Sequence, residues 1–292
     1  MTIIATTDFS EPARDACAVA AHLSHATKQP LDVVHVREGD ETNFSVPSTS
    51  TTDEDKLHAA AEEARAIGAV AMCTTLGGPV ATAIAEAAEM RHARWIVTGW
   101  LGRRFPARWL VGSTAERLCR IAHAPVLVVR EPRSLIGWLE HKTPLKIVVG
   151  VDLTAKDRAL AAFAASLRAI GPCDVTAFHI AWPPALHQRF GIHRPMDLVA
   201  LDPDVEASVL REITDAFGAL PGEGAFRAVT QVGWGKVDDR VAAFAKENAA
   251  DLLVVAAPDR GTLDRLWHGS VSRGAVHLST TNVACVPLPR NP

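Results

Sequence analysis

The stretch that decides the fold is Trp95-Ile-Val-Thr-Gly99-Trp-Leu-Gly102-Arg-Arg-Phe-Pro-Ala-Arg108-Trp-Leu-Val-Gly112-Ser113-Thr114-Ala-Glu116. It begins as a short apolar run, which is typical of a buried parallel strand. A glycine-containing loop follows, and Ser113 with Glu116 three residues later predicts a capping box at the start of a helix. The N–H groups and the positive dipole end of that helix would face the loop. The stretch therefore predicts an anion site, suited most of all to a nucleotide phosphate.

Apolar strands and helices alternate on both sides of this stretch. Further strands are predicted near residues 3–6, 31–36, 69–75 and 125–129. Helices are predicted from Ser10, over about 53–67, after Gly77-Gly78-Pro79 and from Ser113. This alternation implies a parallel sheet with right-handed crossovers. The first part of the chain is thus predicted to be an α/β domain with a five-stranded parallel sheet flanked by helices.

The same pattern recurs in the second half of the chain, which indicates two related domains. Lys146–Asp152 repeats the first strand and Asp8, and Gly269-Ser270 repeats Gly112-Ser113. The separation between equivalent residues grows from 144 to 157 between these two matches, so the second copy carries extra residues, placed most simply in 181–204. We predict a domain at 1–130, a linker at 131–144 that packs on a domain, and a second domain at 145–292.

The bulk composition narrows the class of protein. A chain of 292 residues with 48% hydrophobic and 22% charged residues suits two ordinary globular domains. The net charge of −3 gives no reason to expect nucleic acid as a partner. No apolar run approaches the ~18 residues that span a bilayer, and the first residues lack a signal-peptide pattern. The five cysteines are scattered with no CxxC pair, so a cytoplasmic protein with reduced thiols is expected.

Taken together, these features resemble the universal stress proteins, as a tandem of two UspA-like domains. The resemblance covers Ile3 to Leu288, and its most specific part is the nucleotide-binding signature G-x2-G-x9-G-[ST], met by Gly99, Gly102 and Gly112-Ser113. A P-loop is excluded because the chain contains no GK[ST], and no GxGxxG fingerprint occurs in the first strand–helix turn. The resemblance implies two Rossmann-like, adenine nucleotide alpha hydrolase-like domains, with ATP, with or without Mg²⁺, bound in the first as a regulatory ligand.

The phosphate side of the expected site lies in the signature loop. Glycine at 99, 102 and 112 lets the backbone approach the phosphates closely, because no Cβ intervenes. Ser113 and Thr114 can add hydroxyl and N–H donors. The loop also carries Arg103, Arg104 and Arg108, which either clamp phosphates or are solvated; we include Arg103 among the candidate contacts.

The nucleoside side of the expected site lies at the end of the first strand. Asp8 lies where open α/β sheets bind ligands, and the resemblance implies that it contacts the nucleoside. Its alternative role is that of a helix cap or turn residue. The resemblance further implies a base pocket lined by Thr6 and Thr7, the backbone around Val36, and Thr98.

The second domain departs from the signature. Counting back from Gly269, the first two glycine positions hold Ala256 and Asp259. Asp259 would put a carboxylate where a polyphosphate should lie, and a like-charge contact at 4 Å costs on the order of 1 kcal/mol or more. Asp152 is retained, so a nucleoside or another small ligand remains an alternative, but ATP is not expected in this domain.

Two rival functions stay open. One is a slow ATPase or adenine-nucleotide hydrolase, although no nucleophile–base pair is visible near Ser113. The other is a partner-binding module without a nucleotide. No metal site is assigned, because the twelve histidines show no ligand spacing such as HExxH. The strongest metal candidate is the group His187, His193, Asp197 and Asp202.

The resemblance also bears on assembly. In this family the last strand of one domain meets its counterpart in another, which implies that Pro125–Val129 and Val283–Val286 join the two halves as an intramolecular pseudo-dimer. An uncovered edge would favour aggregation. Dimerisation of whole chains is a further option that the residues leave open.

Overall fold

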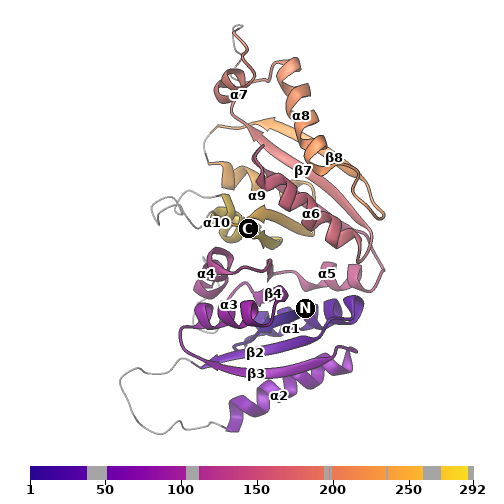
Figure 1. Cartoon of the computed structure of the whole chain (residues 1–292), viewed down its shortest axis with the longest axis vertical. Coiled ribbons are helices and arrows are strands. Elements are labelled where there is room, and N and C mark those ends of the chain that lie inside the picture. Colours follow the sequence, from indigo (N-terminus) through magenta and orange to yellow (C-terminus); the bar gives the residue numbers. More distant parts are fainter. Residues whose placement is uncertain are drawn as a thin grey trace. The chain divides into compact units, whose positions relative to one another are not determined.

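The computed structural model describes residues 1–37, 51–102, 112–193, 197, 199–234, 236–258 and 271–288. The chain divides into two compact units, Met1–Lys142 and Thr143–Pro292. Each unit repeats the alternation of strands and helices along the sequence (Figure 1). The segment between the two predicted domains contains helix α5 (Pro132–Leu139), which buries Leu135, Trp138 and Leu139 within the first unit.

The first unit is built on a five-stranded parallel sheet. Its elements are β1 (Thr2–Thr6), α1 (Glu11–Thr27), β2 (Leu31–Arg37), α2 (Thr51–Ala66), β3 (Ala71–Gly77), α3 (Val80–Met90), β4 (Ala93–Gly99), α4 (Ser113–Ile121), β5 (Val126–Val129) and α5. The strand order is β3-β2-β1-β4-β5. The order reverses between β1 and β4, so the carboxyl ends of these two strands flank the crevice where open α/β sheets bind ligands.

Buried apolar strands and small-residue helices explain this packing. Ile3, Ile4 and Ile96 are fully buried in the central strands, as expected for strands covered on both faces. Helix α1 packs on β1 and β4 and contacts α2 and α5, whereas α3 packs on β2 and β4 and contacts α4. Ser10 caps α1 with its side chain, and Pro12 follows in the first turn.

The second unit repeats this architecture. Its elements are β6 (Leu145–Val151), α6 (Lys156–Arg168), β7 (Cys173–Ala181), α7 (Pro183–Arg189), α8 (Pro203–Phe217), β8 (Phe226–Val232), α9 (Val237–Glu247), β9 (Leu252–Ala256), α10 (Val271–Leu278) and β10 (Asn282–Val286). The strand order is β10-β9-β6-β7-β8, and all pairs are parallel. Helix α7 falls in the segment 181–204, where the sequence predicts the extra residues of this copy.

The registers of the two sheets coincide. Ala5 of β1 pairs with Val97 of β4, and the equivalent Val149 of β6 pairs with Val254 of β9. The predicted fold, an α/β fold with two five-stranded parallel sheets, is confirmed. Among the described residues, no helix has the length and hydropathy needed to cross a membrane.

Candidate functional site

The loop that leaves β1 is held by hydrogen bonds to Asp8. Its Oδ1 accepts from the backbone N–H of Ser10 at 3.0 Å and from the Ser10 hydroxyl at 2.5 Å. The Ser10 Oγ in turn accepts from the N–H of Ala13 at 3.4 Å and thereby caps α1. Between them, Phe9 takes a left-handed φ of +65°. One carboxylate oxygen of Asp8 therefore shapes the turn, in line with the alternative role weighed for this residue.

The other carboxylate oxygen of Asp8 lies beside the signature loop. A Cβ added at Gly102 would be 3.0 Å from Asp8 Oδ2. A Cβ added at Gly112 would be 3.5 Å from the backbone nitrogen of Gly102, and the Gly112 N–H donates to the Trp100 carbonyl at 2.8 Å. The structure thus brings Asp8, Gly102 and Gly112 together, although 94 residues separate Asp8 from Gly102 in the sequence.

Gly99 has a different reason to lack a side chain. A Cβ at this position would lie 2.7 Å from the backbone carbon and oxygen of Pro12, in the first turn of α1. Such a distance is too short for any real Cβ, so glycine is needed for β4 to pack against α1. Gly99 therefore has a role in packing. The sequence had predicted only that glycine at this position lets the backbone approach the phosphates.

The predicted wall residues lie at the carboxyl ends of β1, β2 and β4. Thr6 and Thr98 are buried, and the Thr6 hydroxyl donates to that of Thr98 at 2.9 Å. The Thr7 hydroxyl accepts from the N–H of Phe9, and the Thr7 carbonyl accepts from His35 Nδ1 at 2.8 Å. Val36 lies one strand further, buried and paired with Leu76 of β3.

The start of α4 corrects the predicted capping box. The helix begins at Ser113 as expected, but its N-cap is Gly112, which makes no side-chain hydrogen bond. Ser113 is one residue too far along to cap, and the Glu116 N–H bonds the Gly112 carbonyl. The Ser113 side chain is exposed and that of Thr114 half-buried. Since no side chain among the described residues caps the helix, its first N–H groups are available to a ligand.

Two observations concern the cations expected at this loop. Arg103, with Arg104 and Arg108, lies outside the described residues. Arg130, directly after β5, was missed by sequence reasoning: its guanidinium carbon lies 4.7 Å from the ring centroid of Trp100. Burial lowers the pKa of Arg130 to about 10, so it stays charged at neutral pH. An arginine following the last strand carries no sequence signal that would distinguish it from a surface residue.

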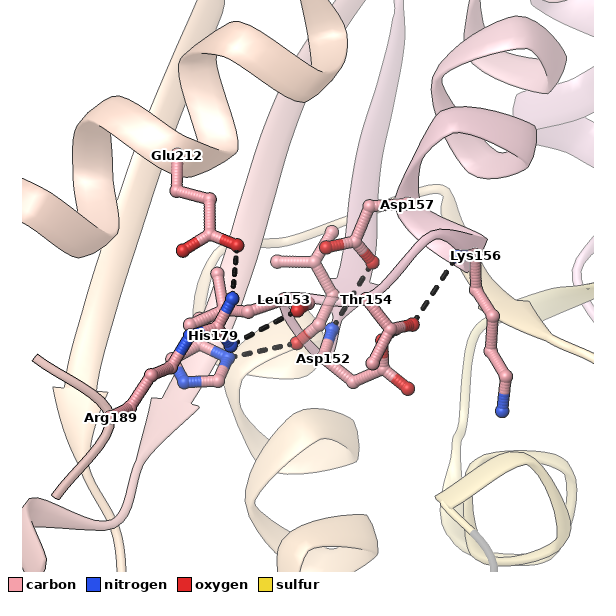
Figure 2. A network of polar contacts seen from close by, with 9 residues as sticks. Asp152, Leu153, Thr154, Lys156, Asp157, His179, Arg189 and Glu212 are labelled. Atoms are coloured by element: carbon pink, nitrogen blue, oxygen red, sulfur yellow. Dashed lines mark hydrogen bonds and ion pairs between the residues drawn. The ribbon is translucent and has the colours of Figure 1, made fainter. Parts of the chain in front are cut away.

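The equivalent loop of the second unit has a similar turn but a different set of side chains (Figure 2). Thr154 donates its hydroxyl to Asp152 Oδ1, as Ser10 does to Asp8, and Leu153 has a φ of +58°. A second carboxylate, Asp157, is buried here and accepts from the Asp152 N–H at 3.2 Å. Desolvation raises the pKa of Asp157 to about 6, against the lowering effect of its backbone hydrogen bonds.

The extra segment of the second unit reaches the same loop. Arg189, the last residue of α7, donates from Nη1 to the Leu153 carbonyl at 3.1 Å and pairs with Glu212 of α8 (Figure 2). His179 bonds the Val151 carbonyl at 3.0 Å, in the same way as His35 bonds Thr7, and burial lowers its pKa. Both histidines thus lie near the ends of their strands and bond a carbonyl that follows the neighbouring strand or ends it.

The buried threonine pair of the first unit has no counterpart in the second. By the shared register, Gly150 stands in place of Thr6 and Val255 in place of Thr98. A closer comparison of the two repeats could have found this loss of hydroxyls from the sequence. Ala256 ends β9 as expected. Asp259, Gly269 and Ser270 lie outside the described residues.

The metal candidate of the extra segment gains no support from the geometry. Asp202 caps α8 by accepting from the Asp204 N–H at 3.0 Å, and Asp197 accepts from the Val199 N–H. His187 is buried in α7. In the part of the chain that the structure describes, no group of three or more histidine, cysteine, aspartate or glutamate side chains is arranged to hold a metal ion.

Comparison with known proteins identifies relatives over both units. The sequence profile of the Universal stress protein family matches residues 1–130 and 145–287. A universal stress protein of Mycobacterium tuberculosis is 28% identical over 246 residues, which cover 82% of this chain and 73% of that protein. A solved universal stress protein from Archaeoglobus fulgidus has a TM-score of 0.70 at 16% identity, with 98% of each chain covered. Another from the same organism, solved in complex with dAMP, covers 43% of this chain and 94% of its own at 25% identity, with a TM-score of 0.37.

Proposed function

The chain belongs to the universal stress protein family, which both of its halves match, and on this premise we propose that its first domain binds ATP as a regulatory ligand of a stress response. The observation that carries the proposal is the meeting of Gly102 and of Gly112, the N-cap of α4, beside Asp8. Such a helix start offers backbone N–H groups and a favourable dipole to an anion. Ser113 and Thr114 supply further donors in the first turn of the helix.

The nucleoside end of ATP belongs on the Asp8 side of this arrangement. A phosphate next to the Asp8 carboxylate would be repelled, whereas a ribose hydroxyl can donate to it. The half-buried turn after β1 holds this carboxylate in place through Ser10. Thr6, Thr7, Thr98 and Val36 then form the floor and wall of the base pocket. Arg103 and Mg²⁺ are included in the proposal as further partners of the phosphates.

The bound nucleotide acts as a ligand rather than as a substrate. Catalysis of hydrolysis needs a base positioned for an attacking water. In this proposal Asp8 is bonded to Ser10 through Oδ1 and to the ribose through Oδ2, so its carboxylate is not assigned to an attacking water. We expect at most slow ATPase activity; steady turnover well above the background would favour the enzyme alternative.

The second domain is proposed not to bind ATP. Gly150 and Val255 stand where the first domain has its two hydroxyl groups. Arg189 donates a hydrogen bond to the Leu153 carbonyl in the turn after β6, and Asp259 adds a negative charge to the loop. Its fold then serves a structural or separate sensing role.

The edge strands β5 and β10 of the two sheets are proposed to pair within one chain, which would protect both edges. The scattered cysteines support the cytoplasm as the location, and a dimer of whole chains remains an option.

The decisive experiment identifies the nucleotide that co-purifies with the protein. Mass spectrometry of the nucleotide released from freshly purified full-length protein should find ATP or another adenine nucleotide. Calorimetric titration with ATP should then give one site per chain. Absence of binding at millimolar ATP would contradict the proposal and favour a partner-binding module without a nucleotide.

A further inference from the structure

The second domain contains a cavity far from the nucleotide-type loop. It lies at the amino-terminal ends of β6, β7 and β8 and has a volume of about 290 Å³. Its lining combines two cations, Lys146 and Arg227, with Asp174, Thr176 and Asn248 and with apolar groups that include Val148 and Ala250. A few polar groups converging on an apolar hollow are typical of a small-molecule site.

The Arg227 guanidinium is held in one orientation at this cavity. Its Nε donates to the Thr176 hydroxyl at 2.7 Å, and its Nη2 donates to Asn248 Oδ1 at 2.8 Å. Arginine has five N–H donors, so this geometry leaves others for a ligand. Over the described ranges, neither Arg227 nor Lys146 makes an ion pair with a carboxylate. Asp174 Oδ1 accepts from the Ala225 N–H at 2.8 Å, and Asp251 Oδ2 accepts from the backbone N–H of Lys146 at 2.9 Å.

The first domain has its own carboxylate at the equivalent position. Asp32 pairs with Ile4 in the sheet as Thr176 pairs with Val148, so Asp32 and Thr176 are equivalent. Asp32 is 1% exposed, and its Oδ2 lies 2.6 Å from Nη1 of Arg91. Desolvation raises the pKa of Asp32, and the neighbouring Arg91 opposes that shift.

The cation is retained in the second domain but comes from another element. Arg91 is the C-cap of α3, and the C-cap of the equivalent helix α9 is Asn248. Arg227 of β8, which pairs with Thr176, supplies the guanidinium and bonds Asn248. The second domain therefore keeps an oriented cation and replaces the carboxylate by threonine.

We propose that this cavity binds a small monocarboxylate from solution, in place of the carboxylate that Asp32 supplies in the first domain. Arg227 contacts the carboxylate through its remaining N–H groups, a geometry that arginine and carboxylate share. Lys146 adds a second positive charge, and Val148 and Ala250 contact a short apolar tail. The volume of about 290 Å³ lies just below the range of about 300–1,000 Å³ that is usual for ligand pockets, which limits the ligand to a small molecule. The Asp174 carboxylate disfavours ligands with more than one negative charge.

The test uses full-length protein with butyrate as the probe and its neutral analogue butyramide. Ligand-observed NMR titration should detect butyrate binding and no butyramide binding. Arg227→Gln should weaken butyrate binding at least tenfold. Arg240→Gln is the matched control, because Arg240 lies on the same domain and bonds only Gln231 among the described residues; it should leave butyrate binding unchanged.

A second variant tests the internal comparison directly. Thr176→Asp supplies an internal carboxylate to Arg227, as in the first domain, and should abolish butyrate binding while raising Tm. Thermal unfolding and the circular dichroism spectrum of the full chain check that each variant is folded. The proposal is overturned if butyramide binds as well as butyrate, if Arg227→Gln or Thr176→Asp retains full binding, or if inorganic phosphate binds more tightly than butyrate.

Discussion

Single atoms decide what the loop between β4 and α4 can accept. The missing Cβ at Gly102 leaves room beside Asp8 Oδ2, at a place where a methyl group would be 3.0 Å away. The missing Cβ at Gly99 leaves room for the backbone of Pro12 at 2.7 Å. We therefore propose different roles for two glycines of one signature, Gly102 in the ligand site and Gly99 in the packing of β4 on α1.

Replacing Gly102 tests the first of these roles. Gly102→Asp places a second carboxylate beside Asp8 and in the proposed phosphate path, so ATP affinity should fall more than tenfold, a loss of about 1.4 kcal/mol or more. Isothermal titration calorimetry measures the change. Gly77→Asp is the control, since a Cβ at Gly77 meets no atom within 4 Å. Normal ATP binding by Gly102→Asp would refute both this geometry and the explanation offered for Asp259.

Replacing Gly99 tests the second role. Gly99→Ala forces the start of α1 away from β4, and overpacking of this kind costs about 1–3 kcal/mol. Thermal unfolding should show Tm lowered by several degrees, while the ATP affinity of the folded fraction stays within a few-fold of wild type. Gly77→Ala should leave Tm nearly unchanged. A Tm for Gly99→Ala equal to that of wild type would show that the close contact with Pro12 is not rigid.

At the scale of elements, the turn between β6 and α6 carries a pH-dependent contribution to stability. The folded state raises the pKa of Asp157 to about 6 from its ordinary 3.8, because the carboxyl is desolvated. The folded protein then binds a proton more tightly than the unfolded chain does. This contribution is fully present below the unfolded pKa and is lost as the pH rises through about 6.

The matching experiment compares Tm of the wild type with that of Asp157→Asn between pH 4 and 7. The variant has no carboxyl at this position, so it should not lose this contribution to stability as the pH rises. The Tm of the variant minus that of the wild type should therefore increase between pH 4 and pH 7. Asp215→Asn, an exposed change on α8, serves as the control and should follow the wild type. Parallel curves for wild type and Asp157→Asn would show that the carboxyl titrates alike in both states.

At the scale of the whole molecule, the same fold occurs twice with different chemistry at the same strand ends. The first unit has a buried threonine pair and an uncapped α4, whereas the second has Gly150, Val255 and the Arg189 contact from its extra segment. The proposal of a nucleotide site in one copy alone rests on these differences. A small carboxylate at Arg227 would give the second copy a ligand of its own.

Hydrogen exchange of the full chain can locate ATP on one unit. Saturating ATP should slow exchange at the turn after β1 and in the first turn of α4. The equivalent segments, the turn after β6 and the start of α10, should exchange as they do without ATP. Equal protection of both units would contradict the proposed asymmetry and indicate two nucleotide sites per chain.

The sequence by itself determined the fold class and the repeat. Apolar runs at strand length and helical spacing are local properties, so the strands around Ile3 and Trp95 and the start of α4 at Ser113 could be read directly. The glycine signature and Asp8 also carried local signals for an anion site. The predicted N-cap of α4 was one residue too late. Ser113 and Glu116 match the capping-box pattern, but Gly112 takes the N-cap position.

Only the tertiary structure decided which of these residues meet. The approach of Asp8 to Gly102, the hydrogen bond between Thr6 and Thr98 and the packing of Gly99 on Pro12 all join segments that are distant in sequence. Arg189 reaching Leu153 and Arg227 reaching Thr176 follow from strand order and from the length of the extra segment. Contacts of this kind depend on register and packing across the sheet, which no local pattern of residues encodes.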